Sequence, residues 1–129
     1  MSEPTLSPSF LYKIVLPDPS LDMASYGMVI PPSPLDAASG FVHLSTADQV
    51  PLTASRFFGD QGEIWVFKLP YTGLKGKTKW ERVVHDDGGV DNFPHLYREL
   101  KAGADISEVV KLKKDVRHMW IFPEGFLEY

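Results

Sequence analysis

The stretch Gly40-Phe41-Val42-His43-Leu44-Ser45-Thr46 places a histidine inside an apolar run of residues that favour β-structure. Because side chains alternate along a strand, His43 shares one face with Phe41 and Ser45, while the intervening apolar residues share the other. We therefore expect a strand over residues 41–44 with one face in the core and the other in a polar cleft. Ser45 or Thr46 can cap a following helix, and capping alone is the alternative to a role in binding.

A second histidine stands in Phe93-Pro94-His95-Leu96-Tyr97. If this segment is extended, the imidazole of His95 and the phenol of Tyr97 lie two residues apart on one face and can share a pocket. Pro94 also fits the first position of a short helix ending at Leu100, and a turn is the other possibility. Either the two histidine segments meet in a site, or their aromatic residues fill the core.

Outward from these segments, apolar periodicity predicts the other elements. About six strands and two or three short helices that do not alternate strictly indicate a single α+β domain over residues 10–129, after a flexible tail at residues 1–9. A continuous apolar run bounded by Gly62 and Pro70 predicts a central strand covered on both faces. The expected strands are Phe10–Val15, Ile64–Phe67, Trp80–Val84, Val109–Leu112 and Met119–Phe122, and the expected helices are Leu21–Tyr26 and one from Pro51 to Phe58.

Composition excludes several classes of function. The chain has 129 residues with a formal net charge of -4, which argues against general nucleic-acid binding because that binding needs clustered Lys and Arg. No stretch approaches the roughly 20 apolar residues of a membrane-spanning helix, and residues 1–10 do not resemble a signal peptide. With no cysteine and no His-x-x-x-His spacing, we expect no metal site. We expect a soluble, cytoplasmic protein without a membrane partner.

Six residues are candidates for chemistry in the cleft, namely His43, Ser45, Thr46, Glu81, His95 and Tyr97. His43, with the hydroxyls that follow it, can hold a ribose or a phosphate, because imidazole both donates and accepts hydrogen bonds. Glu81 lies on the strand face opposite Trp80, where a carboxylate can stabilise a cationic transition state. Each has a structural alternative. His43 can be a buried histidine bonded to backbone, the aromatic residues around His95 can belong to the core, and Glu81 can be an ordinary surface carboxylate.

These motifs together resemble the family called domain of unknown function 952, over roughly Leu11 to Val110. The resemblance depends on the order and spacing of five stretches, which are Leu11–Ile14, Ser33–Asp36, Gly40–Val50, Lys79–Glu81 and Phe93–Tyr97. That family is placed distantly with the ADP-ribosyltransferase-like folds. The resemblance implies two small, mostly antiparallel sheets with a cleft between them that takes NAD.

The resemblance also implies roles for individual residues. In such folds a histidine on the first strand, followed by a hydroxyl residue, holds the NAD ribose, which corresponds to His43 with Ser45 and Thr46. Tyr97 corresponds to the residue that stacks on nicotinamide. Glu81, with His95 as a possible substitute, corresponds to the catalytic group. The motifs quoted above contain no Glu-x-Glu or Gln-x-Glu pair, so ligand binding without catalysis is implied as well.

The sequence therefore predicts a protein that binds NAD or an ADP-ribose-type nucleotide and acts on its ribose linkage. Glu81 and His95 are the catalytic candidates, and His43, Ser45, Thr46 and Tyr97 are the binding candidates. One alternative is a non-catalytic module for a nucleotide or another small ligand. A second is a metal-free hydrolase that uses His43 and His95 as an acid-base pair, which requires both rings to reach one substrate atom. The sequence identifies no cofactor, although NAD is a possible ligand, and it does not give the oligomeric state.

Overall fold

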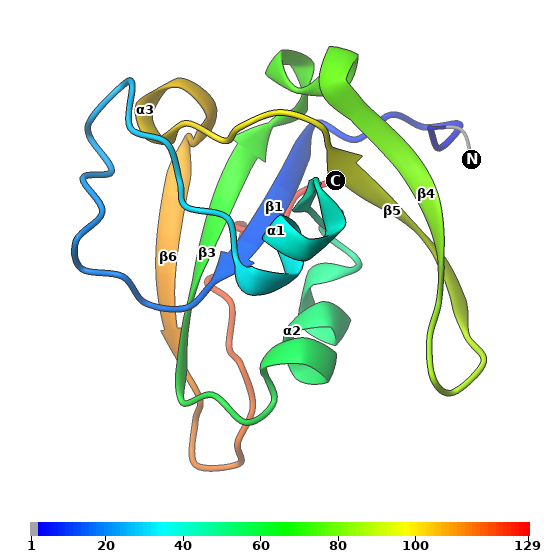
Figure 1. The fold of residues 1–129 in the computed structure, drawn as a ribbon. Helices are drawn as coiled ribbons and strands as arrows, with labels where there is room; N and C mark the ends of the chain where they lie inside the picture. The colour runs from blue at the N-terminus through cyan, green and yellow to red at the C-terminus, as the bar shows by residue number, and fades with distance from the viewer. Residues whose placement is uncertain (1–2) are drawn as a thin grey trace.

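A computed structural model describes residues 3–129 of the chain. The strands are β1 (Phe10–Val15), β2 (Val42–His43), β3 (Glu63–Pro70), β4 (Thr78–Val84), β5 (Val90–Leu96) and β6 (Glu108–Lys113). The helices are α1 (Pro34–Ser39), α2 (Val50–Phe58) and α3 (Ala102–Asp105), and the single turns η1 (Tyr71–Gly73) and η2 (Lys75–Lys77) are 3-10 helices. The strands form two antiparallel sheets, with orders β1-β3-β6 and β2-β5-β4, as Figure 1 shows. The predicted α+β fold with two small antiparallel sheets is confirmed.

Strand β3 is the centre of the first sheet, as its continuous apolar run predicts. Its side chains alternate between two buried clusters. Ile64 and Val66 pack with α2 and the carboxyl-terminal segment, whereas Trp65 and Phe67 pack in the core that includes Trp80 of the second sheet. Both faces of β3 are therefore covered, which explains why its sequence shows no polar alternation.

The two sheets are joined edge to edge where the chain leaves β2. Tyr12 of β1 and Ser45 exchange two backbone hydrogen bonds, with N–O distances of 2.8 and 2.9 Å. The segment that carries His43 thus runs from the second sheet to the edge of the first. This connection brings β1, β2 and β5 side by side and places the predicted polar face of residues 41–45 between the sheets.

Helix α1 precedes the histidine strand and is set by a capping box. Ser33 accepts a hydrogen bond from the backbone N of Asp36, and the Asp36 carboxylate accepts one from the backbone N of Ser33. Gly40 ends the helix with a φ of 81°, a conformation that favours glycine, and turns the chain into β2. Pro34 is the first residue of this helix, where its missing N–H is tolerated.

Strand β5 corrects one prediction. The helix from Pro94 to Leu100 is wrong, because residues 90–96 form the central strand of the second sheet. Pro94 lacks an N–H, but its ring is buried, its carbonyl accepts from Leu44 N, and the partner strand β2 is only two residues long. The segment is extended, which is the condition under which His95 and Tyr97 share a face.

Three further predictions of local structure are wrong. Residues 21–26 form turns rather than a helix, and residues 119–122 contribute a single bridge, between Trp120 and Lys114, rather than a strand. Gln49 occupies the N-cap position of helix α2 without a side-chain cap hydrogen bond, so neither Ser45 nor Thr46 is the cap. These segments are short, so tertiary contacts outweigh local propensity in them.

The flexible tail stays a prediction. Met1 and Ser2 lie outside the described residues, and Ser9 accepts a hydrogen bond from Tyr71 N. Within residues 3–129, no helix is both long and apolar enough to cross a bilayer.

Candidate functional site

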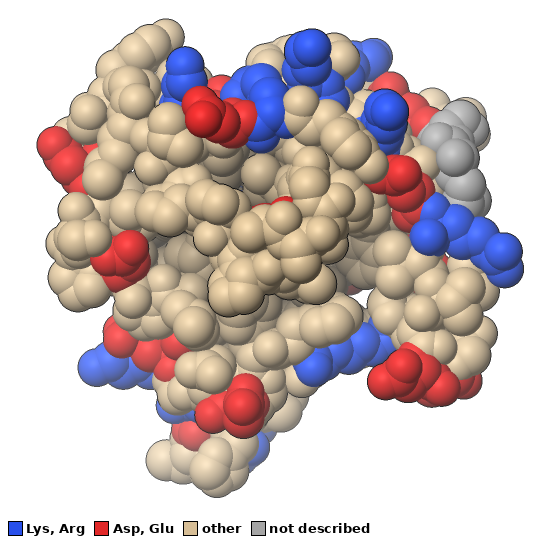
Figure 2. All heavy atoms as spheres, viewed as in Figure 1, with Lys and Arg blue, Asp and Glu red and all other residues tan. Residues whose placement is uncertain are grey.

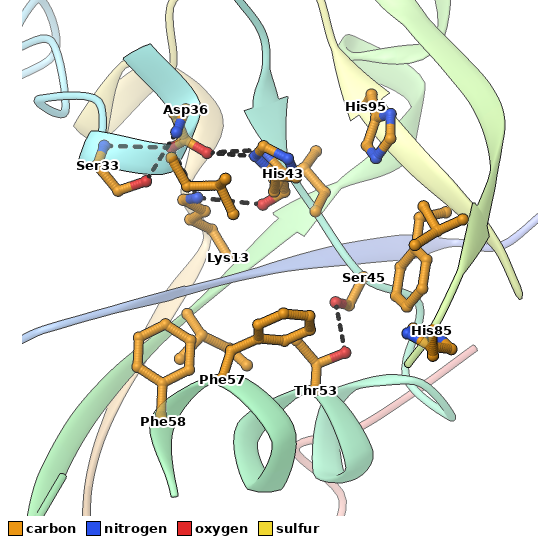
Figure 3. A pocket seen from close by; sticks show the side chains of 15 residues that line it. Lys13, Ser33, Asp36, His43, Ser45, Thr53, Phe57, Phe58, His85 and His95 are labelled. Atoms are coloured by element: carbon orange, nitrogen blue, oxygen red, sulfur yellow. Dashed lines mark hydrogen bonds and ion pairs between the residues drawn. The ribbon is translucent and has the colours of Figure 1, made fainter. Parts of the chain in front are cut away.

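A cavity of about 280 Å³ lies between the two sheets and the helices α1 and α2 (Figure 3). Its apolar lining includes Phe57 and Phe58 of α2 and Phe93 of β5. Figure 3 shows His43 and His95 together at the end of the cavity away from α2. Both rings also line an adjoining outer groove of about 740 Å³, so they stand where the inner cavity meets the groove. The two histidine segments of the sequence do meet in one cavity.

The first histidine is oriented by a carboxylate of α1. Nδ1 of His43 lies 2.7 Å from Oδ1 of Asp36, which also accepts a hydrogen bond from the backbone N of His43. Because an ionised carboxylate only accepts, Nδ1 carries the hydrogen of this bond, and Nε2 is the ring nitrogen left to meet a ligand. The side chain of His43 is 30% exposed, so the ring is neither sealed in the core nor bonded to backbone, as its structural alternative required.

The Asp36 carboxylate is itself balanced by a buried lysine. Nζ of Lys13 lies 2.8 Å from Oδ2 of Asp36 and donates to the carbonyl oxygen of His43. Burial alone would raise the pKa of Asp36, but the hydrogen bond from His43 and the charge of Lys13 outweigh it, and the pKa is well below its usual range. Burial lowers the pKa of Lys13, and the charge of Asp36 opposes that shift. The group is an internal ion pair that fixes the ring of His43.

The second histidine is oriented by a carboxylate of β4. Nδ1 of His95 lies 2.9 Å from Oε1 of Glu81, and the Tyr97 hydroxyl donates to the same oxygen at 2.6 Å. These hydrogen bonds, with that from Tyr97 the larger, lower the pKa of Glu81, which is therefore ionised at neutral pH. The pKa of Tyr97 is raised in return, mainly by its bond to Glu81. When the ring of His95 is neutral and donates from Nδ1, its Nε2 keeps a lone pair.

The two imidazoles face each other across antiparallel strands. His43 is the register partner of His95, and the ring centroids are 5.2 Å apart at an interplanar angle of 65°. Phe41 stacks on His95 at 4.1 Å and packs against His43 at 4.6 Å, so it limits the rotation of both rings. Burial lowers the pKa of His95, with the hydrogen bond to Glu81 opposing and the neighbouring His43 assisting, so its ring is neutral at pH 7.

The hydroxyl candidates are placed differently. Ser45 lines the cavity, and its Oγ lies 3.4 Å from Oγ1 of Thr53 on α2. Thr46 is buried, donates to Asp48 at 2.5 Å and is not among the residues that line the cavity. The structure thus brings His43, Ser45, Glu81 and His95 to one place, with Tyr97 behind Glu81, and leaves Thr46 outside. Their roles in binding and catalysis remain predictions.

A third histidine lines the opposite part of the cavity, where the β4–β5 hairpin approaches α2. Nε2 of His85 lies 2.7 Å from Oδ2 of Asp91. Arg56 of α2 is held 3.2 Å from Asp87 and 3.8 Å from Asp91, which ties the helix to the hairpin. In the part of the chain that the structure describes, no group of three or more His, Asp or Glu side chains is arranged to hold a metal ion.

Sequence reasoning did not select Lys13 and Asp36. Two signals were available in the sequence. Lys13 interrupts the otherwise apolar strand Phe10–Val15, which implies a buried charge that needs a partner, and Ser33-x-x-Asp36 is a capping-box spacing. Neither signal says that the two side chains meet at His43. A Gln-x-Glu spacing also occurs at Gln61-Gly62-Glu63, but it lies where β3 begins and outside the cavity lining.

The fold and site define a class of small α+β protein, in which two antiparallel sheets enclose a cavity with a pair of carboxylate-oriented histidines. The chain belongs to the family described as "Protein of unknown function (DUF952)", whose model matches residues 15–111. The predicted family membership is therefore confirmed.

Solved structures of one protein resemble this chain. The crystal structure of protein CC0527 from Caulobacter crescentus is 29% identical, with a TM-score of 0.69, and the match covers 87% of this chain and 93% of that one. Its solution NMR structure is 29% identical with a TM-score of 0.66, covering 86% and 90%. None of the curated proteins matches this chain.

Proposed function

We propose that the cavity binds NAD or an ADP-ribose-type ribosyl compound and that the paired histidines act on its ribose linkage. The observation that carries this proposal is the pair of imidazoles, His43 and His95, each held at Nδ1 by a carboxylate and only 5.2 Å apart between ring centroids. Two acceptor nitrogens at this spacing suit the neighbouring hydroxyls of a ribose, each of which can donate one hydrogen bond.

The remaining walls suit the other parts of such a ligand. Phe57, Phe58 and Phe93 form an apolar side of the cavity against which a flat heterocycle can pack. Glu81 lies beside His95 and keeps its negative charge at neutral pH. A carboxylate in that position favours the positive charge that develops on ribose when a glycosidic bond breaks.

The reaction that fits these groups is hydrolysis of a ribose–base bond. The C1′–N bond breaks, its electron pair leaves with the base, and water attacks the cationic ribose carbon. Neutral His95 accepts the proton that this water loses, since burial keeps the pKa of its imidazole low. His43, fixed by Asp36, holds the ribose while the bond breaks.

A second function is favoured by the same spacing. Two imidazoles within reach of one substrate atom can serve as acid and base in a metal-free hydrolase. In that case one ring must be protonated while the other is neutral, so activity would follow a bell-shaped pH profile. A binding module without catalysis would use the same contacts and would leave its ligand unchanged.

The test is a thermal-shift panel that contains NAD, ADP-ribose, nicotinamide riboside and adenosine. A ligand present at 100 times its dissociation constant adds about 2.7 kcal/mol, which is several degrees for a chain of this size. The His43→Ala variant should lose the shift and still fold, whereas His118→Ala, a change outside the cavity, should keep it. If no ribosyl compound shifts the melting temperature, the proposal is wrong. If NAD binds, release of nicotinamide over hours separates an enzyme from a binding module.

A further inference from the structure

We propose that the inner cavity recognises the base and ribose of its ligand as an uncharged or cationic unit and discriminates against a phosphate attached to them. This inference rests on the proposed function and names the part of the ligand that the site holds. For NAD, the nicotinamide riboside half would enter the inner cavity and the pyrophosphate would stay outside. Lys13 in the inner cavity and Arg56 at its outer side both already hold carboxylates of the protein.

The one lysine that lines the inner cavity, Lys13, is committed to internal partners. Its ammonium group is 2.8 Å from the Asp36 carboxylate and donates to the His43 carbonyl oxygen at 3.2 Å. Both side chains of the ion pair are buried, at 7% and 2% exposure. Turning Lys13 toward a phosphate would leave Asp36 as an unpaired buried charge, which is strongly unfavourable.

The amino-terminal end of α1 is also occupied. Backbone N–H groups at a helix start attract anions, and Ser33 lines the cavity there. In this chain the Asp36 carboxylate accepts from Ser33 N, and Ser33 Oγ accepts from Asp36 N. A protein carboxylate thus stands where a phosphate would otherwise bind.

The outer groove offers no net positive charge either. Arg56 is held by the carboxylates of Asp87 and Asp91. Two guanidinium groups line the groove, and three carboxylates line it with them; the five residues are Arg56, Arg82, Glu81, Asp86 and Asp87. Figure 2 shows a hollow between the body of the molecule and the β4–β5 hairpin, with basic and acidic side chains both beside its lower end.

The buried histidine, His95, does not supply a positive charge at neutral pH. Burial and the nearby His43 keep His95 neutral there. With Lys13 and Arg56 held by carboxylates, the site has apolar walls, the imidazoles of His43 and His95 and the ionised Glu81. A phosphate dianion entering the inner cavity would lose its hydration and, among the described residues there, meet no lysine or arginine that is free of a carboxylate, whereas a neutral nucleoside or a pyridinium would not suffer that loss.

The experiment compares matched ligands by calorimetry at pH 7.5, namely nicotinamide riboside against nicotinamide mononucleotide, and adenosine against AMP. The nucleoside of at least one pair should bind at least as tightly as its phosphorylated form. Its affinity should also change by less than about twofold between 50 and 300 mM salt, because no ionic contact with phosphate is made. A phosphorylated form that binds ten times more tightly than its nucleoside overturns the inference and leaves the proposed function standing. Failure of all four ligands, together with NAD and ADP-ribose, defeats the proposed function itself.

A variant gives the same proposal a second test. Asp87→Asn releases Arg56 from its closer partner, and the Asp87 side chain is 64% exposed, so the fold should tolerate the change. Affinity for the mononucleotide should rise about threefold or more, while affinity for the riboside stays constant. Asp86→Asn is the matched control, since it removes the same charge from the same hairpin without releasing Arg56 and should produce a smaller rise. A mononucleotide affinity in Asp87→Asn that is no higher than in the unaltered protein would contradict this account of Arg56.

Discussion

The two histidine–carboxylate pairs make the same kind of contact in different surroundings. Asp36, which holds His43, has a side chain that is 2% exposed, and a buried lysine compensates its charge. Glu81, which holds His95, is 38% exposed to solvent. Its carboxylate accepts a hydrogen bond from the Tyr97 hydroxyl and has no buried cation beside it among the described residues. A carboxylate can therefore orient an imidazole either as part of the core or from the surface. Only the first arrangement makes the stability of the fold depend on the site.

The largest expected difference between the pairs is in stability. Lys13→Met removes the cation beside Asp36 and keeps much of the side-chain volume, so it leaves a buried carboxylate without its ion pair. We expect the free energy of unfolding to fall by about 3–5 kcal/mol. Glu81→Gln, made at the exposed pair, should cost less than about 1 kcal/mol. Urea denaturation of both variants measures the contrast, and equal losses would show that burial does not distinguish the two pairs.

A second prediction concerns the loss of stability in acid. The folded-state pKa of His95 lies below its ordinary value of 6.5, so the unfolded chain takes up a proton first as the pH falls through that value. The pKa of Asp36 is also lowered, from 3.8, so its contribution is present above about pH 4 and is lost below it. Stability should therefore fall in two steps on acidification. Denaturation curves from pH 8 to pH 3 will show the steps, and His95→Gln should remove the upper one alone.

Contacts within a short segment could be predicted from the sequence, whereas contacts between segments that are distant in the chain could not. Alternation within two short segments correctly placed His43 beside Ser45 and His95 near Tyr97, because the period of a strand is a local property. The meeting of the segments required a register between strands, which no local pattern contains. Pro94 favoured a helix locally, and burial of its ring together with the pairing of its strand with β4 decided otherwise.

The internal ion pair of Lys13 and Asp36 could not be predicted from the sequence, because it also depends on contacts between distant segments. Lys13 lies on β1, Asp36 on α1 and His43 on β2, so three elements must pack before the network exists. The sequence shows a charge inside an apolar strand and a capping box, each with an adequate local explanation. Only the tertiary structure shows that both residues contact His43.

The third prediction changes the exposed pair without unfolding the protein. The hydrogen bond from His95 to Glu81 raises the pKa of the imidazole against the effect of burial. Glu81→Gln removes that support, so the pKa of His95 should fall further below 6.5, and the pKa of Tyr97 should return toward 10.0. NMR titration of the ring signals measures both shifts. A rise in the pKa of His95 would mean that its Nδ1 does not donate to this carboxylate.

The smallest effect is expected for Tyr97→Phe. The Tyr97 hydroxyl makes the leading contribution to the low pKa of Glu81, and its loss should move that pKa upward, toward 4.5, while His95 continues to hold the carboxylate. Stability should change by less than about 0.5 kcal/mol, because the Tyr97 side chain is at the surface and its ring is kept. Carboxyl NMR signals follow the pKa, with Tyr26→Phe as the control, since Tyr26 is 75% exposed. An unchanged Glu81 pKa would show that His95 alone holds that pKa low, whereas Asp36 in the buried pair has two such partners, His43 and Lys13.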